Sequence, residues 1–584
     1  MEKPNKIERI KTQRNASEFW EKIETFDWLH PNEADRFYLK SYGIYNIKIR
    51  PEAWLIRLRI DGGDLPIKHA HTLSGLAKRD NLSLLLTARS QLELHGLSAE
   101  TVYPVYQALH TEGIDTRQTL TDNFRAIVTD PLDGLAPDSH IICRPIIATI
   151  REQFLGRPEW MGTIPRKFNT ALIGRETPSF NPWSNDVLFA LAEKASTWGF
   201  NLYLGGKNSE TAQSADVFCL PEHVSDCFMA IARLYQQYGL RGSRAKTRLY
   251  HLIETVGMEQ IRLWLEADLP HSLHPAGTLR MRSSTDNTDH LLPIERYGVY
   301  GEISPETLRH VARKAEQDNL TLRLTPHQQL WLFDPNKISP YTETHKSGAQ
   351  LRTLHPTEHS PITKSPSTID HQPSTNLPLY PLPSTHYPLV AQKATTCAGS
   401  HYCGLSLWNI KSDMETMPLQ PLIEHGISLG FSGCLKGCGR HYHSNIGLMG
   451  LRTNLYGETE RAVRVFLGAT QAPDPTPARM IYYSVPERSL GALFQVILED
   501  FEQSGVETFE RFSRHVLNSY SVEMIQAWYL VQQLFEVGET AHRIFLSGKN
   551  EEELWAVLKM LPDFPAYDEH YEAIRDMAHR LWDR

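Results

Sequence analysis

The chain has 584 residues, of which 41% are hydrophobic and 22% charged, the composition of an ordinary globular protein. Its length exceeds what one hydrophobic core usually organises, so we expect several domains. The net charge of −8 and the pI of about 6.4 argue against a protein that binds nucleic acid through overall positive charge. The first twenty residues contain no apolar signal segment, and no stretch approaches 18 apolar residues. We therefore expect no export signal, no membrane partner and a cytoplasmic location.

An internal repeat organises the chain after a polar and aromatic N-terminal arm and a first strand, Trp54 to Ile60. Residues 80–94 (DNLSLLLTARSQLEL) and 318–332 (DNLTLRLTPHQQLWL) share nine of 15 residues at a constant offset of 238. A β-rich run and then a helical stretch, 67–78 or 305–317, precede each copy, so each predicts strand–helix–strand. Because such a unit has open edges, we expect the two copies to pair into one composite α+β domain.

Later segments are also related in pairs. Residues 221–239 and 486–505 both predict an amphipathic helix, and 257–264 (GMEQIRLW) matches 521–528 (SVEMIQAW). The chain therefore looks duplicated, with one half near 50–270 and the other near 295–535. Residues 335–390 contain ten prolines and no hydrophobic period, which indicates a long loop or linker. The tail beyond about residue 541 predicts extra helices.

Four of the seven cysteines fall within 42 positions. Cys397 and Cys403 enclose five residues, and Cys434 and Cys438 enclose three. Two local thiol pairs fit the four corners of a [4Fe–4S] cluster. Zinc is an alternative, although zinc pairs usually enclose two to four residues, and four unpaired core cysteines are another. The other three (Cys143, Cys219 and Cys227) are scattered, as ordinary small core residues are.

The pattern C-x5-C, then C-x3-C with a trailing IGLMG, resembles the cluster motif of the siroheme-dependent nitrite and sulfite reductases. The surrounding residues are most similar to ferredoxin-nitrite reductases. This resemblance implies that Cys397, Cys403, Cys434 and Cys438 hold a [4Fe–4S] cluster, with Cys438 also shared with siroheme. The family usually has C-P-N-x-C, and here Lys436 stands inside the second pair. A lysine beside the cluster would favour its reduced state.

The resemblance covers roughly residues 35–530 and implies an internally duplicated α+β chain with a pseudo-twofold axis. The expected parts are a composite ferredoxin-like domain, built from the two βαβ repeats, and two related α/β domains for siroheme and the cluster. We divide the chain into an N-terminal arm (1–50), a first ferredoxin-like half (51–113), a first siroheme-binding α/β domain (114–280), a second ferredoxin-like half (290–334), a linker or insertion (335–392), a second α/β domain with the cysteines (393–540) and a C-terminal helical extension (541–584).

Basic residues must neutralise the carboxylates of siroheme and an anionic substrate, because burying uncompensated charge is costly. Arg89, in TARSQLELHG, resembles the family's T-x-R-Q-x-x-Q-x-H-G, whose arginine faces the substrate side of siroheme. Ser90 and Glu93 replace two glutamines of that motif, and His327 occupies the place of Arg89 in the second repeat. The same motif implies that Thr87, Gln91 and His95 contact the cofactor.

Two further segments supply candidate substrate residues. Arg125, in TDNFRAIVTDPLDG, resembles the family's D-N-x-R stretch, and Lys167 and Asn169, in GTIPRKFNTALIG, resemble L-P-R-K-[FW]-x. Positions 167 and 169 share one face of a strand. The family's sulfite reductases have lysine where this chain has Asn169, and its nitrite reductases have asparagine. One lysine with a neutral amide suits nitrite, whereas two lysines suit the sulfite dianion.

A basic run at 239–251 could also reach siroheme carboxylates; its members are Arg241, Arg244, Lys246 and Arg248. A solvated helix face, or a docking patch for an acidic electron carrier, is the alternative for this run.

The sequence therefore predicts a siroheme-dependent oxidoreductase that reduces nitrite to ammonia with six electrons. We find no G-x-G-x-x-G opening a βαβ unit and no flavin or nicotinamide region, so electrons must come from an external protein, by resemblance reduced ferredoxin or a similar donor. Sulfite reduction with the same cofactors is the near alternative, and an oxygen-dependent step of corrinoid synthesis is a third family role. A divergent relative that keeps the cysteines but has lost siroheme is the non-catalytic alternative.

Overall fold

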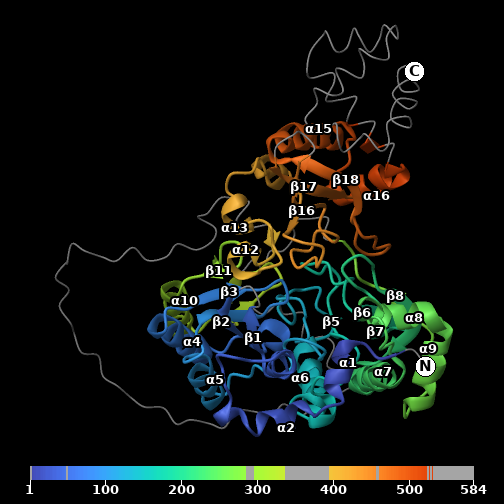
Figure 1. Ribbon diagram of the computed structural model, residues 1–584. Coiled ribbons are helices and arrows are strands. Elements are labelled where there is room, and N and C mark those ends of the chain that lie inside the picture. The colour runs from blue at the N-terminus through green and yellow to red at the C-terminus, as the bar shows by residue number, and fades with distance from the viewer. Residues whose placement is uncertain are drawn as a thin grey trace, which may run out of the picture.

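The computed structural model describes residues 3–47, 50–283, 295–335, 394–454 and 459–522, and also 525, 526 and 529. The predicted linker at 335–392, apart from its first residue, and the predicted extension at 541–584 lie outside the described residues. Among the described helices, none is long and apolar enough to cross a membrane. In Figure 1 the first half of the chain lies below and the second α/β part lies above.

Each copy of the repeat contains a helix followed by a hairpin; one strand precedes the helix in the first copy and two short strands precede it in the second. The first copy consists of β2 (Arg50–Arg57), α4 (Ile67–Arg79), β3 (Ser83–Leu86) and β4 (Leu92–Leu97). The second consists of β10 (Glu295–Tyr297), β11 (Glu302–Ile303), α10 (Pro305–Gln317), β12 (Thr321–Leu324) and β13 (Leu330–Phe333). The single strand that we predicted after each helix is therefore wrong: a turn divides it into two strands, β3–β4 and β12–β13, because the chain reverses at 87–91 and at 325–329.

The repeat is preserved in detail. Each residue that α10 buries has a buried counterpart in α4 at the offset of 238; the pairs are Ala70 and Leu308, Leu73 and Val311, Ser74 and Ala312, and Ala77 and Ala315. Helix α4 also buries Leu76, whose counterpart Lys314 is not buried. The spacing of three and four residues places each set on one helix face. Left-handed residues also recur at the same offset, with φ of 52° at Asn81 and Asn319, 54° at Ser90 and 61° at Gln328.

The two copies pair as expected. Strand β11 of the second copy lies antiparallel to β3 of the first, with Glu302 opposite Leu85, and the resulting sheet has the order β1-β2-β4-β3-β11. The second sheet has the order β10-β13-β12, and Leu65 N donates to Leu322 O at 3.0 Å across the two copies. Leucines from both copies share one buried core. The composite α+β domain is therefore confirmed.

The N-terminal arm packs on this domain. Its edge strand β1 pairs antiparallel with β2, so the sheet begins inside the segment that we assigned to the arm. The elements around this sheet are α1 (Lys6–Lys11), α2 (Ala16–Trp20), α3 (Glu33–Leu39), β1 (Ile44–Ile47) and α5 (Val102–Thr111).

The two α/β parts share a topology. The first contains α6 (Cys143–Phe154), β5 (Thr170–Ile173), β6 (Val187–Lys194), β7 (Thr197–Leu204), β8 (Gln213–Cys219), α7 (Val224–Tyr238), α8 (Leu249–Val256), α9 (Met258–Asp268) and β9 (Thr278–Leu279). The second contains β14 (Thr395–Thr396), α12 (Gly399–Tyr402), α13 (Ile410–Asp413), α14 (Gln420–Glu424), β15 (Leu429–Ser432), β16 (Ile446–Thr453), β17 (Glu460–Leu467), β18 (Arg479–Pro486), α15 (Leu490–Gln503) and α16 (Phe509–His515).

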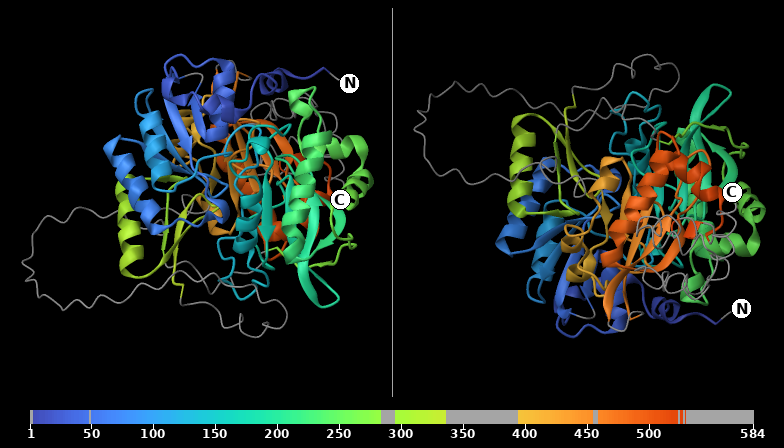
Figure 2. Two further views of the ribbon diagram at one scale, coloured as in Figure 1. Left: turned by 90° about the horizontal axis from the view of Figure 1, so that it is seen from below. Right: turned by 90° about the horizontal axis from the view of Figure 1, so that it is seen from above.

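In each α/β part a parallel strand pair is followed by two antiparallel strands and a long helix. The order is β5-β6-β7-β8 and then α7 in the first part, and β15-β16-β17-β18 and then α15 in the second. Helices α7 and α15 are the pair that the sequence predicted. Seen from above or below, the second sheet (orange) lies over the junction between the repeat domain (blue) and the first α/β part (teal and green) (Figure 2).

Short 3₁₀ helices connect these elements: Ile23–Thr25, Lys40–Tyr42, Asp61–Gly63, Pro158–Trp160, Pro221–His223, Arg244–Lys246, Glu487–Ser489 and Leu517–Ser519.

Candidate functional site

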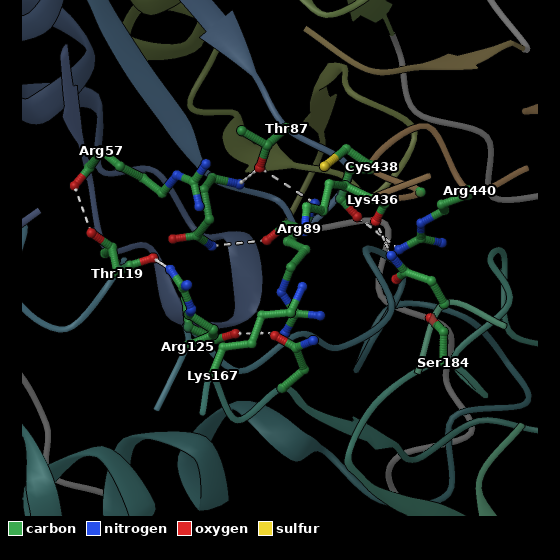
Figure 3. Close-up of a pocket in the computed structure, with 16 residues that line it drawn as sticks. Arg57, Thr87, Arg89, Thr119, Arg125, Lys167, Ser184, Lys436, Cys438 and Arg440 are labelled. Carbon is green, nitrogen blue, oxygen red and sulfur yellow. Dashed lines mark hydrogen bonds between the residues drawn. The ribbon is translucent and has the colours of Figure 1, made fainter. Parts of the chain in front are cut away.

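A cavity opens where the first repeat, the first α/β part and the loop with Cys434 and Cys438 meet (Figure 3). It holds about 900 Å³ of empty space, including the part open to solvent. Its lining residues are Arg57, Thr87, Ala88, Arg89, Gln91, Thr119, Arg125, Ala126, Lys167, Asn169, Ser184, Asn208, Lys436, Gly437, Cys438 and Arg440.

The lining contains six basic residues and no carboxylate. Like charges held together in a partly desolvated space repel one another, so their charged forms become less favourable unless an anion enters. The arrangement therefore fits an anionic ligand. The four substrate residues that the sequence singled out (Arg89, Arg125, Lys167 and Asn169) all lie in this wall, together with Cys438.

Arg89 lies on the turn between β3 and β4, and two contacts hold its guanidinium. Nη1 donates to Asn185 Oδ1 at 2.8 Å and Nη2 donates to Ala126 O at 3.0 Å. Burial, and then the charge of the neighbouring Arg440, lower the pKa of Arg89 to about 9. Both partners of the guanidinium are neutral, so its positive charge stays available to a ligand.

Arg125 follows a loop whose carbonyls hold it in place. Its Nη2 donates to Thr121 O at 3.0 Å and its Nη1 donates to Thr119 O, while its buried Nε has no hydrogen-bond partner among the residues that the structure describes. Burial, and then the charges of Arg57 and Arg89, hold the pKa of Arg125 well below its usual range. A donor left unsatisfied in a cationic cavity is a position where an anion would be stabilised.

Lys167 and Asn169 flank Phe168, which forms a parallel bridge with Phe124 and is fully buried. Because alternate residues of an extended chain face the same way, both polar side chains reach the cavity while the ring enters the core. Within the described chain the Lys167 ammonium has no hydrogen-bond or ion-pair partner. Burial, and then Arg248, lower the pKa of Lys167 to about 7, so this group can hold or release a proton near neutrality.

Arg440, Arg57 and Lys436 complete the cationic lining, and we did not predict them as substrate-side residues. Arg440 stands two residues after Cys438, donates to Ala88 O at 2.7 Å and lies 5.2 Å from the centre of the Phe180 ring. Burial lowers its pKa to about 10. The nearness of Arg440 to a cysteine motif was the sequence signal for it. No comparable local signal marked Arg57.

The structure divides the predicted cofactor contacts of the first repeat. Thr87 lines the cavity, and its hydroxyl accepts from Gln91 N at 3.2 Å. The Gln91 side-chain amide is engaged by the backbone of Ile60: it accepts from Ile60 N and donates to Ile60 O, each at 2.8 Å. His95 does not line the cavity and lies 2.9 Å from Glu93 instead.

The basic run at 239–251 does not reach the cavity, and carboxylates of this chain hold three of its members. Arg244 donates to both oxygens of Asp122 at 2.6 Å, Arg248 donates to both oxygens of Asp186 at 2.8 Å, and Arg241 pairs with Glu8. Lys246 is exposed. The prediction that these residues neutralise siroheme carboxylates finds no support in their positions, because their partners come from segments far away in sequence.

Cys438 lies close enough to the other three clustered cysteines to shift their pKa values. Cys397, directly after β14, accepts N–H groups from Gly399 at 3.4 Å and Gly433 at 3.2 Å, so the two cysteine motifs meet at this sulfur. Burial raises the pKa of the Cys397 thiol to about 11, and it also raises the pKa of Cys403 and Cys434. Cys438 adds to all three shifts and is itself exposed.

Backbone N–H groups point at three of these sulfurs, the donors for Cys403 being Leu405 and Ser406 and that for Cys434 being Lys436. Such donors stabilise thiolates and tune iron–sulfur clusters. Among the described residues, no three His, Cys, Asp or Glu side chains form a group able to hold a single metal ion. The donor set and its N–H groups fit a cluster held by four thiolates.

Comparison with known proteins found a matching family model and similar relatives. Residues 120–273 match the model of the "Nitrite and sulphite reductase 4Fe-4S domain". The chain is 27% identical over 495 residues to a ferredoxin–nitrite reductase of Synechococcus elongatus, covering 80% of this chain and 90% of the relative. It is 24% identical over 507 residues to a protein named sulfite reductase [ferredoxin] 2 from Mycolicibacterium paratuberculosis, covering 81% and 83%.

A solved structure has the same fold. The structure of the Mycobacterium tuberculosis NirA protein superposes with a TM-score of 0.72 at 20% identity and covers 89% of this chain and 97% of that one. The duplicated architecture described above is therefore shared over nearly the whole of both chains.

Proposed function

We propose that this chain, which belongs to the nitrite and sulfite reductase family, catalyses the six-electron reduction of nitrite to ammonia with electrons from an external protein donor. The observation that carries the proposal is the cavity lining: six cations without a carboxylate, with Asn169 beside Lys167 and Cys438 in the wall.

The residues present fit the two cofactors that the family uses. Cys397, Cys403, Cys434 and Cys438 offer four thiolates for a [4Fe–4S] cluster, and backbone N–H groups support three of them. The arginines and lysines of the cavity suit the carboxylates of siroheme, and we assign Cys438 to both groups because it lies in the cavity wall. When bound, the cofactors supply the iron and the electron path.

The chain's own residues hold the substrate anion. Arg89 and Arg125 keep their guanidinium groups in fixed positions through backbone and amide contacts, so little reorganisation is needed when charge develops on a leaving oxygen. Removing one such donor from an enzyme typically costs about 10²–10³ in rate.

Lys167 is the best placed proton donor of the cavity. Its pKa of about 7 means that the ammonium can give a proton to a departing oxygen, which leaves as water, and can recover a proton from solvent near neutral pH. Asn169 contributes a neutral amide at the next position on the same face. One cation and one amide suit a monoanion better than a dianion.

The surface next to the cysteines supports a protein donor. Leu405, Leu407 and Leu435 are 62%, 56% and 63% exposed, and they follow Cys403 and Cys434 within a few residues. Large exposed apolar side chains close to these cysteines in sequence favour contact with another protein. Relatives are named for ferredoxin, and we propose reduced ferredoxin or a comparable carrier as the donor.

Sulfite reduction is the second candidate, because one relative bears the name of a sulfite reductase. The test measures ammonium from nitrite and sulfide from sulfite on one anaerobic preparation with reduced methyl viologen. We expect nitrite to be the better substrate by kcat/KM, and we expect Asn169→Lys to shift the ratio toward sulfite. Asn169→Gln, which adds length without charge, is the matched control. A wild-type protein that prefers sulfite would reject the proposal.

A further inference from the structure

Glu93 pairs with one cation of the cavity wall. It lies on β4 directly opposite Arg57 on β2, in the antiparallel register of the two strands. Arg57 Nε donates to Glu93 Oε1 at 2.6 Å, and Arg57 Nη2 contacts the same oxygen. The Glu93 side chain is only 6% exposed. Directly opposed residues of opposite charge stabilise each other across strands.

The second carboxylate oxygen is also used. Glu93 Oε2 lies 2.9 Å from His95 Nε2, and His95, two residues further along the strand, shares its face. The His95 ring packs edge-on against Tyr402, with 4.8 Å between ring centres. Glu93 itself does not line the cavity, whereas Arg57 does. The carboxylate is therefore held behind the wall and acts on the cavity only through the arginine.

Arg57 differs from the other five cations in this respect. No other basic residue of the lining forms an ion pair with a carboxylate in the part of the chain that the structure describes; these residues are Arg89, Arg125, Lys167, Lys436 and Arg440. The charge of Arg57 nevertheless acts on the other cations of the cavity, because it lowers the pKa of both Arg89 and Arg125. Whatever balances Arg57 changes the field that an entering anion meets.

We propose that Glu93 is a positioning residue that sets the charge of the cavity: by holding and neutralising Arg57 it favours a monoanion over a dianion. The inference rests on the proposed function, and it adds Glu93 to Asn169 as a residue that determines the preference for nitrite over sulfite. Coulomb energy is proportional to the product of the charges. One additional positive charge in the wall therefore favours a dianion with twice the free energy that it gives a monoanion, and specificity is the difference between the two.

The test uses Glu93→Gln in the cofactor-loaded protein. The amide oxygen of glutamine can still accept from Arg57, so the contact is retained and the negative charge is lost. Binding of nitrite and of sulfite is measured by calorimetry, at a pH where sulfite is a dianion. If nitrite affinity rises by a factor f, sulfite affinity should rise by about f². A rise that is equal for the two anions, or no rise, would overturn the proposal.

A double variant separates charge from structure. Arg57→Gln with Glu93→Gln removes both charges and should return the sulfite-to-nitrite affinity ratio to that of the wild type. If it keeps the ratio of Glu93→Gln, the effect does not act through Arg57 and the proposal fails. Should Glu93→Gln not fold, Arg57→Gln alone replaces it: Glu93 then stays unbalanced behind the wall, and sulfite binding should weaken more than nitrite binding.

This readout is independent of turnover. A protein that shows the predicted ratios but produces no ammonium would reject the proposed reaction and keep the role of Glu93. A protein that reduces nitrite, but whose sulfite-to-nitrite affinity ratio stays at the wild-type value in all three variants, would keep the proposed reaction and reject the role of Glu93.

Discussion

The turn after β3 and the turn after β12 have the same backbone and different surroundings. Ser90 and Gln328 occupy equivalent left-handed positions, with φ of 54° and 61°. One residue earlier, Arg89 enters the cationic cavity, whereas His327 stacks on Trp331 with 5.5 Å between ring centres. Burial, and then Arg296, lower the pKa of His327 to about 4, so this side chain is neutral at physiological pH. The same turn supplies charge in one copy and packing in the other.

The left-handed residues have diverged as well. Gln328 accepts from Thr396 N at 2.7 Å and donates to Leu86 O at 3.1 Å, so it ties the second turn to the strand before Cys397 and to the first repeat. The hydroxyl of Ser90 is buried and has no hydrogen-bond partner in the described part of the chain. The first turn thus serves the anion cavity and the second supports the cysteines. Duplication preserved the hairpin, because its geometry depends on backbone and core, and left the tips free to acquire separate roles.

The largest expected effect comes from removing the sulfur side of the site. Cys438→Ser should abolish nitrite reduction and lower the iron and acid-labile sulfide content, since serine is a poor ligand for this cluster. Iron analysis and the visible absorption spectrum are the measurements. Cys227→Ala, in the core of the first α/β part, is the control and should keep its iron. A Cys438→Ser protein with full iron content would contradict the ligand assignment.

Exchanging the tip residues between the two turns tests the comparison directly. Arg89→His places the residue of the second copy in the first and should lower kcat/KM for nitrite by about 10²–10³, as for the loss of one charge-stabilising donor. His327→Arg should give no such loss through substrate contact, but it buries another cation near Arg296 and Arg440 and should destabilise the protein by about 3 kcal/mol. Ammonium assays and urea unfolding measure the two effects.

The exchange has a clear contrary result. An Arg89→His enzyme with near wild-type kcat/KM would show that the first turn does not serve the anion.

The pH dependence sharpens the role of the first half. Because burial depresses the pKa of Lys167 to about 7, its ammonium is charged below that pH and neutral above it. Nitrite remains an anion throughout this range, so kcat/KM should fall by up to about tenfold per pH unit as pH rises through about 7. Lys167→Arg keeps its charge and should remove this fall. The same decline in both proteins would assign it to another group.

The smallest effects concern the two left-handed positions. Gln328→Ala leaves the buried N–H of Thr396 without its acceptor and should lower the free energy of unfolding by about 1–3 kcal/mol. Ser90→Ala removes an unpartnered hydroxyl and should change it by less than about 0.5 kcal/mol. Urea unfolding of the pair measures the difference. Equal losses would mean that the second turn does not support the cysteine strand.

Much of the fold was predictable from local pattern and internal repetition. The buried faces of α4 and α10 follow from the spacing of their apolar residues, and the offset of 238 related the two copies before their pairing was seen. The hairpins were not predicted. A turn divides the strand that we expected after each helix, and its left-handed residue is not glycine, the residue that usually indicates such a turn. Ser90 and Gln328 adopt φ above 50°, and neither residue type indicates this conformation in the sequence.

The candidate site was predictable where chemistry is local and unpredictable where charge is shared over distance. Arg89, Arg125 and Lys167 stand in short recognisable segments, and all reach the cavity. Arg244 and Arg248 look equally basic in sequence, but Asp122 and Asp186 neutralise them from other segments.

By itself the sequence determined the duplicated plan, the spacing of the four thiols and the residue types that meet an anion, since these depend on composition and spacing along the chain. Only the tertiary structure decided which cations remain unpaired. Arg57 and Glu93 are 36 residues apart, and strand pairing makes them neighbours. The effective charge of a side chain depends on what folding places within a few ångströms of it, and spacing along the chain does not encode that distance.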